Sequence, residues 1–414
     1  MTPGADAAAP DADAENTGVT IKTFAEGVPF STGRTENAML VAFQDGDGPW
    51  AVLSGVGGVY HANPISPRYG VAVGCVATRS RVDVYYLAIS DTRDVLATGC
   101  AGTIETARLS VDLKGVLPDE LGEVWVGRAA ARVQGGGAFA LDAPKEVADV
   151  FARSFSQSGS GGTNNVKAYR GATLDVRSDA VLPIDMAASR PIEFRPLTIT
   201  GLGTGISDDF LSVRSTFVTK NSHVQWPLHA TDIVNPSTTP LDSYATLDAT
   251  MRQPDDVSSV LVVATAVMPT IAYQRVARAA FQGAGTQTVD LPDIINAAPP
   301  VREAGTPNIT VTIPVVPSRL GYITYQAILQ GSATIPVDRT WTLSFRPGWA
   351  AGRESIVVTT PDLSALPGWR PEMGLPGVLG WNISWTDSNM PDGTPAIDGR
   401  RSIESRVTSV NGSL

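Results

Sequence analysis

The sequence predicts an all-β fold, arranged as β-sandwich units in tandem. Short runs rich in Val, Ile, Thr and aromatic residues alternate with period two, as half-buried strands do. These runs are bounded by Gly, Pro, Asn, Asp and Ser, the residues that end strands and form turns. Helical periodicity is scarce along the 414 residues. Many short strands with frequent turns favour sandwiches over α/β layers.

The predicted strands follow one another along nearly the whole chain. They cover residues 38–43, 50–54, 69–74, 82–89, 123–127, 138–143, 173–178, 212–219, 257–267, 308–316, 322–329, 340–345 and 355–360. Two segments, 145–155 and 273–281, also fit a helix, and a strand remains open for both. The β class therefore does not depend on these two segments.

Turn-rich linkers divide the chain into five segments. Residues 1–17 are a low-complexity Ala/Asp/Pro tract, which cannot bury a core and is expected to be a flexible tether. Four predicted sandwiches follow, at residues 18–102, 103–190, 191–300 and 301–414. The last unit holds five of the eight tryptophans.

The net charge and the lack of long apolar runs limit which partners and which compartment are expected. The formal net charge is −10, which disfavours nucleic acid and anionic membranes because both attract basic surfaces. No apolar run reaches the length of a transmembrane helix, and residues 1–17 lack the features of a signal peptide. Because the tether stands first, we expect an export signal before it in the gene. The protein is then secreted or tethered to the outer membrane or cell surface.

The two cysteines, Cys75 and Cys100, each follow an apolar strand-like run. An isolated even pair favours a disulfide in an oxidising compartment, in the first sandwich. Two buried thiols acting as small hydrophobic side chains are the alternative. A zinc site is disfavoured because further Cys or His ligands are not near in the sequence.

The stretch "FQDGDGPW" places Asp45 and Asp47 two residues apart, as at the start of a calcium loop. An EF-hand loop needs further oxygen ligands and a glutamate at position twelve, which here is Val56. We therefore interpret the stretch as a hairpin turn and expect no cofactor. Asp45 and Asp47 stay weak calcium candidates.

No catalytic motif emerges from the sequence. The patterns G-x-S-x-G, H-E-x-x-H and S-x-x-K are absent from the 414 residues. Of the three histidines His61, His223 and His229, the last two have even spacing around "VQWPL", but a third metal ligand for that pair is not in view. We expect that the protein is not an enzyme and has no catalytic residues.

The C-terminal tryptophans are the most informative group. Trp381 and Trp385 lie four apart on a period-two strand, so they share a face and are expected to fill the core. Trp349 and Trp369 each follow Pro-Gly and are the candidates for exposed, ligand-binding aromatics. Exposed tryptophans would form a stacking platform for a glycan.

Several core and turn motifs resemble those of a known family. The stretch "VAFQDGDGPWAVLSGVGGVY" followed by "RYGVAVGC" resembles carboxypeptidase-regulatory-like, or transthyretin-like, sandwich domains of bacterial surface proteins. With "GRAAARVQGGGAFALDAP" and "LGWNISW", the chain is similar to uncharacterised surface lipoproteins of myxobacteria-like predatory bacteria. The resemblance implies Ig-like or transthyretin-like sandwiches and a surface location. It supplies no catalytic residue, and no lipobox cysteine is visible.

Three functions remain open. The leading one is a structural or adhesive role, in which loops or exposed strand edges contact a protein, a glycan or copies of the same chain. The second is a glycan-binding module that uses the C-terminal tryptophans. The third is a hydrolase whose site is assembled from scattered carboxylates.

Overall fold

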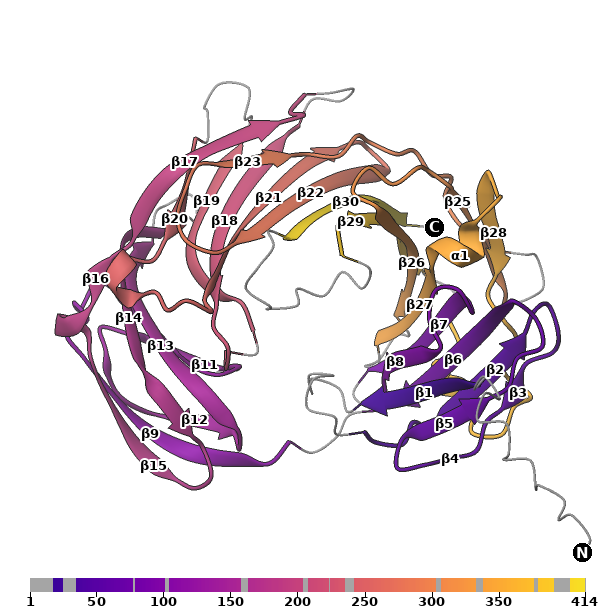
Figure 1. Ribbon diagram of the computed structural model, residues 1–414, viewed down its shortest axis with the longest axis horizontal. Helices are drawn as coiled ribbons and strands as arrows, with labels where there is room; N and C mark the ends of the chain where they lie inside the picture. Colours follow the sequence, from indigo (N-terminus) through magenta and orange to yellow (C-terminus); the bar gives the residue numbers. More distant parts are fainter. Residues whose placement is uncertain are drawn as a thin grey trace, which may run out of the picture.

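The structure, a computed structural model, confirms the all-β class. It describes residues 18–24, 35–76, 79–100, 104–157, 163–203, 208–222, 224–234, 242–302, 307–332, 338–375, 379–390 and 403–413. Within them, regular structure is nearly all strand; helical turns are confined to α1 (Pro347–Ala350) and short 3-10 turns such as η5 (Pro371–Met373). The strands follow one another around a ring that brings the first strands next to late ones (Figure 1).

One long sheet runs through most of the molecule. Among the described residues it has twelve strands, in the order β19-β18-β21-β22-β30-β29-β26-β27-β7-β6-β2-β3. Their bounds are β2 (Leu40–Asp45), β3 (Ala51–Val52), β6 (Arg68–Val76), β7 (Ser80–Ala88), β18 (Phe210–Val218), β19 (Trp226–Val234), β21 (Val257–Val267), β22 (Ile271–Phe281), β26 (Tyr322–Ser332), β27 (Asp338–Phe345), β29 (Leu379–Ser388) and β30 (Ile403–Ser413). Neighbouring strands are antiparallel except β27 and β7, which run parallel.

Three smaller sheets pack against this long sheet. They are β4 (Gly55–Val56)-β5 (Val59–Ala62)-β1 (Val19–Phe24)-β8 (Asp94–Thr98), β20 (Ser243–Thr246)-β17 (Glu193–Thr200)-β23 (Gln287–Asp290), and β24 (Val301–Arg302)-β25 (Ile309–Pro314)-β28 (Ser355–Thr359). Figure 1 shows β17, β23, β25 and β28 outside the long sheet. Each sheet contributes apolar side chains to a separate buried cluster.

The middle of the chain forms a sandwich of its own. One sheet is β11 (Ala129–Gln134)-β10 (Leu121–Val126)-β13 (Val147–Gln157)-β14 (Thr163–Asp175)-β16 (Arg190–Pro191). The other is β12 (Gly137–Pro144)-β9 (Thr106–Lys114)-β15 (Ala180–Asp185). The core between them, which we call the middle core, draws all its fully buried members from residues between Ala107 and Met186.

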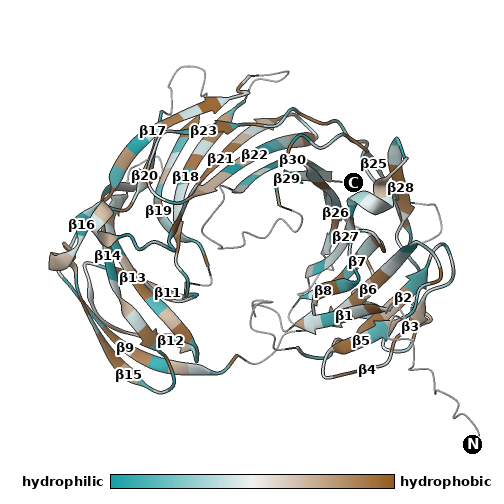
Figure 2. Ribbon diagram, viewed as in Figure 1, coloured by the Kyte–Doolittle hydropathy of each residue, from teal (hydrophilic) through white to brown (hydrophobic). Residues whose placement is uncertain are grey.

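Both segments that also fitted a helix are strands. Residues 145–155 lie mostly in β13 and residues 273–281 lie in β22. From Tyr273 to Ala279, buried residues of β22 alternate with less buried ones. Figure 2 shows hydrophobic and hydrophilic residues following one another along the strands. Sheet pairing on both sides of each strand outweighs their helical propensity.

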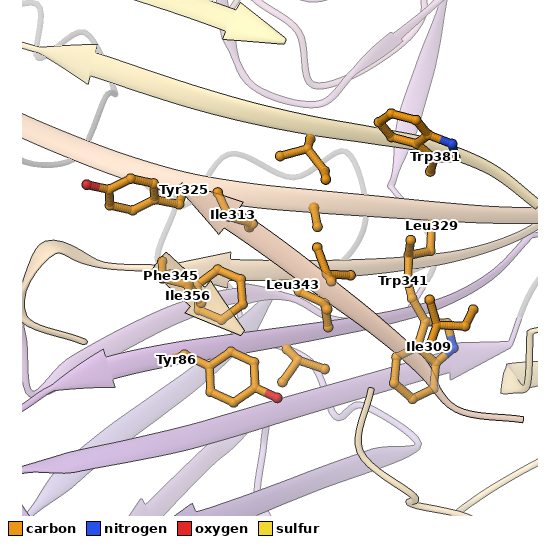
Figure 3. Close-up of a cluster of buried hydrophobic side chains, with 14 of the residues drawn as sticks. Tyr86, Ile309, Ile313, Tyr325, Leu329, Trp341, Leu343, Phe345, Ile356 and Trp381 are labelled. Atoms are coloured by element: carbon orange, nitrogen blue, oxygen red, sulfur yellow. The ribbon is translucent and has the colours of Figure 1, made fainter. Parts of the chain in front are cut away.

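The predicted units at 18–102, 103–190, 191–300 and 301–414 stay a prediction, and the long sheet crosses their boundaries. β7 of the first unit pairs with β27 of the last, and β22 of the third pairs with β30 of the last. The largest buried cluster, which we call the shared core, combines Leu40, Val82 and Tyr86 with residues from Tyr273 to Val410. Figure 3 shows Ile313 and Ile356 of the β24-β25-β28 sheet gathered with Leu343 of the long sheet.

Candidate ligand-binding site

Cys75 and Cys100 form a disulfide, with their Cα atoms 5.1 Å apart. Cys75 lies in β6 of the long sheet, and Cys100 lies two residues beyond the end of β8 in the covering sheet. The bond therefore ties together the two layers of the first sandwich. The side-chain cluster between these layers includes Ile21, Val71 and Val95.

Asp45 and Asp47 belong to the turn between β2 and β3, as the hairpin interpretation predicts. Gly46 has φ of 56°, which favours glycine. The Asp45 carboxylate accepts hydrogen bonds from the backbone N–H groups of Ile65 and Ser66, at 3.0 and 2.8 Å. These bonds lower the pKa of Asp45. Among the described residues, no three His, Cys, Asp or Glu side chains gather as metal ligands would.

The tryptophan expectations have different outcomes. Trp381 and Trp385 are buried in the shared core, as predicted. The expectation that Trp349 is exposed is wrong, because its exposed fraction is 4%. Pro347 starts the helical turn α1, which turns the indole onto Tyr86, with ring centroids 5.0 Å apart.

Trp369 is half-buried rather than a free platform. Its ring meets Trp341 edge-on, with centroids 6.3 Å apart, and it packs on the rim of the shared core. Trp349 and Trp369 therefore do not form a flat exposed pair. The sequence signal that misleads is Pro-Gly, which marks a turn but does not say which way the next side chain points.

The histidines lie apart from one another. His61 is exposed on β5, and His229 on β19 meets the ring of Phe194 edge-on at 5.1 Å. His223 lies outside the described residues. The two described histidines are on different sheets and contribute to no shared site.

Buried carboxylates are held by arginines. Asp208 pairs with Arg275 at 2.5 Å, and both side chains are almost fully buried. Glu123 likewise pairs with buried Arg153 at 2.6 Å. Each buried charge is thereby compensated, which is what stability requires of an ion out of water. The two pairs account for these buried carboxylates, except that Asp208 Oδ1 has no hydrogen-bond partner among the described residues.

One face of the long sheet carries a row of polar residues, in which Ser384 and Ser409 are buried and Gln274 is exposed. Across β27, β26, β29, β30 and β22, the register aligns Ser344, Gln326, Ser384, Ser409 and Gln274 in one row. The opposite face carries the shared core. Seen from the sequence, these polar residues are only the alternate positions of strands; the register alone shows that they meet.

A pocket of about 250 Å³ lies at one end of this face. The end of the row there is Tyr85 of β7, which is the register partner of Ser344. Tyr322, Thr324 and Thr386 also line the pocket. On β6 the next residue of the row is Val71, which is buried under the β4-β5-β1-β8 sheet. The pocket therefore lies where that smaller sheet ends.

An arginine organises the rim of the pocket. The Arg346 guanidinium donates a hydrogen bond of 2.8 Å to the Tyr322 hydroxyl and lies 5.9 Å from the centre of that ring. Gln326 Nε2 donates to Ser344 Oγ at 3.4 Å. The pKa of Tyr85 is raised, chiefly by burial and secondly by the Asp83 carboxylate, so its hydroxyl stays protonated.

A second pocket, of about 280 Å³, opens on the other side of β29. Ile295, Val316 and Trp385 give it an apolar lining, and the ion pair between Arg319 and Asp293 lies at its rim. The Asp387 carboxylate accepts four hydrogen bonds from the neighbouring loop, donated by the Ser318 hydroxyl and the backbone N–H groups of Arg319 and Leu320. This pocket has apolar walls and few free polar groups.

The fold defines an all-β protein built on one long sheet, with a pocket on each side of β29. No family model matches the chain, and no curated protein matches it. The named family resemblance in the sequence therefore stays a prediction. Within the described residues, no helix is long and apolar enough to span a membrane.

Among solved structures, the chain is similar to a streptococcal ancillary pilin. The sequence identity is 6%, and the match covers 66% of this chain and 98% of the pilin chain. The TM-score is 0.15. A likeness at this level carries no argument about function, so the proposals below rest on the structure alone.

Proposed function

We propose that the protein is a non-enzymatic structural or adhesive component of a cell surface or secreted matrix. The observation that carries the proposal is the long sheet, which joins strands from both ends of the chain and has a pocket at one end of its polar row. A parallel strand pair between β7 and β27 and the shared core hold the two ends together. Such a sheet is a rigid support for a binding surface.

The compartment follows from the disulfide. A bond between Cys75 and Cys100 persists in oxidising surroundings outside the cytoplasm. The net charge of −10 keeps such a protein soluble and opposes binding to nucleic acid. The partner is then a protein or a glycan at the surface, or a second copy of the chain.

The test combines location with adhesion. On intact source cells, added protease should cut the protein, and a maleimide should label Cys75 and Cys100 only after reduction. Beads coated with the purified protein should adhere to those cells more than beads coated with heat-unfolded protein. Protection from protease together with freely labelled thiols would place the protein inside the cell. Adhesion equal to that of the unfolded control would remove the adhesive role.

A further inference from the structure

The pocket at Tyr85 combines aromatic rings with neutral hydrogen-bonding groups. Tyr85 and Tyr322 supply rings, and Thr324, Thr386 and Gln326 supply two hydroxyls and an amide. None of the described residues that line it carries a carboxylate. Rings with an apolar face and a polar edge suit a ligand that is itself apolar on its faces and hydroxylated around its rim.

Three hydroxyls of the lining are available to a ligand. The side-chain oxygens of Tyr85, Thr324 and Thr386 have no hydrogen-bond partner in the residues that the structure describes. Each hydroxyl is both a donor and an acceptor, as sugar hydroxyls are. The three come from β7, β26 and β29, so only the assembled sheet brings them to one place.

The rim is preorganised. The hydrogen bond from Arg346 fixes the Tyr322 ring beside the pocket, so ordering that ring costs little on binding. The guanidinium is therefore already used in positioning Tyr322. Arg346 is the one charged residue among the described residues of the lining.

We infer that this pocket binds one sugar unit of an uncharged oligosaccharide or polysaccharide, which deepens and rests on the proposed adhesive function. Tyr85 and Tyr322 pack against the sugar ring, and the hydroxyls of Thr324 and Thr386 with the Gln326 amide bond its hydroxyls. A volume of about 250 Å³ is below the range of pockets for drug-sized molecules and suits a single ring.

Charge selects the neutral class of glycan. The chain carries a net charge of −10, so an acidic polysaccharide is repelled at long range. The adjoining row along the sheet consists of serine and glutamine side chains. Gln274, at the far end of that row, is exposed and lies outside the pocket. It supplies a matched control on the same face.

The test titrates the full chain by calorimetry with short neutral oligosaccharides of glucose, xylose, mannose and N-acetylglucosamine. Two variants remove one hydroxyl each with little change of shape, Tyr85→Phe and Thr386→Val. Each should weaken binding of the best sugar about fivefold, as expected for one lost hydrogen bond, and the double variant about 25-fold. Gln274→Ala should bind like the unmodified protein, and equal melting temperatures show that the variants fold.

The outcomes separate this site from the proposed function. Binding that both variants leave unchanged would overturn the assignment of the pocket. Binding of oligogalacturonate but of no neutral sugar would overturn the neutral class. If no sugar binds at concentrations on the order of 10 mM while coated beads still adhere to cells, the sugar site is wrong and the adhesive function stands. If the beads do not adhere either, both proposals fail.

Discussion

The shared core and the middle core are built in opposite ways. The middle core takes its fully buried members from one continuous stretch, between Ala107 and Met186. The shared core combines Leu40, Val82 and Tyr86 with residues from Tyr273 to Val410. Where the two ends of the chain meet beside the shared core, the Asp91 carboxylate accepts a hydrogen bond from the backbone N–H of Gly348, 257 residues away in sequence.

The difference shows how a chain with sandwich-like sequence patterns becomes a ring. The contacts of the middle core join segments of one stretch of about 80 residues, whereas the contacts of the shared core join the two ends of the chain. Bringing the two ends together costs conformational entropy, and this cost grows slowly with the length of the loop. That cost is offset by extensive burial, including Trp341, Phe345 and Trp385. Long-range closure is also what creates the pocket, since Tyr85 and Tyr322 come from opposite ends of the chain.

The largest expected effect compares one leucine in each core. Leu343→Ala and Leu109→Ala should each lower the free energy of unfolding by about 2 to 5 kcal/mol, because both side chains are fully buried. Hydrogen exchange should separate them. Leu343→Ala should deprotect both residues 40–88 and residues 307–390, and Leu109→Ala should deprotect residues 104–186. Deprotection by Leu343→Ala of only one chain end would show that the shared core is not cooperative.

The disulfide gives the next largest expected effect. It stabilises the N-terminal part of the chain, whereas the middle core contains no cysteine. Replacing Cys75 and Cys100 by alanine should cost about 3 kcal/mol in the chain-entropy model for a separation of 25 residues. Denaturant unfolding with and without reductant measures the loss. The variant itself should not respond to reductant. An unmodified protein that is equally insensitive would contradict a stabilising bond.

A smaller effect is expected at the junction of the two chain ends. The Asp91 carboxylate accepts from the N–H groups of Ala88 and Gly348, both at 2.7 Å. Asp91→Ala should cost about 1 to 2 kcal/mol, because both donors lose their partner. Asp362→Ala, which removes a turn bond to Ser364 on the surface, is the control and should cost less. If thermal unfolding shows equal losses of stability for the two variants, the hydrogen bonds of Asp91 do not stabilise the junction more than an ordinary surface turn.

The smallest expected effect is a loss of stability in acid that depends on Asp149, a residue of β13 in the middle of the chain. Burial raises the pKa of Asp149, but hydrogen bonds from Thr173 and Asn221 outweigh it and hold the pKa below its ordinary value. The stabilisation is therefore present above the ordinary pKa of an aspartate and is lost as the pH falls through the lowered value. Thermal unfolding of Asp149→Asn and the unmodified protein should differ at pH 7 and converge in strong acid. A constant difference would contradict this assignment.

Local patterns predict the strands well and the site poorly. The all-β class, the hairpin at Asp45, the Cys75–Cys100 bond and the burial of Trp381 and Trp385 all follow from residues close in sequence. Trp349 was misassigned because its burial depends on Tyr86, a residue far away in the chain. Nothing in the single strands around Tyr85 or Thr386 indicates that they line one pocket.

The sequence by itself determined the β class, the turns and which strand faces are apolar, because period-two patterning and turn chemistry act over a few residues. The tertiary structure decided which strands pair, above all the parallel pairing of β7 with β27. Strand registry between distant segments depends on the burial of a whole core rather than on any local preference. The pocket beside Tyr85 exists only because that pairing places β7 next to β27.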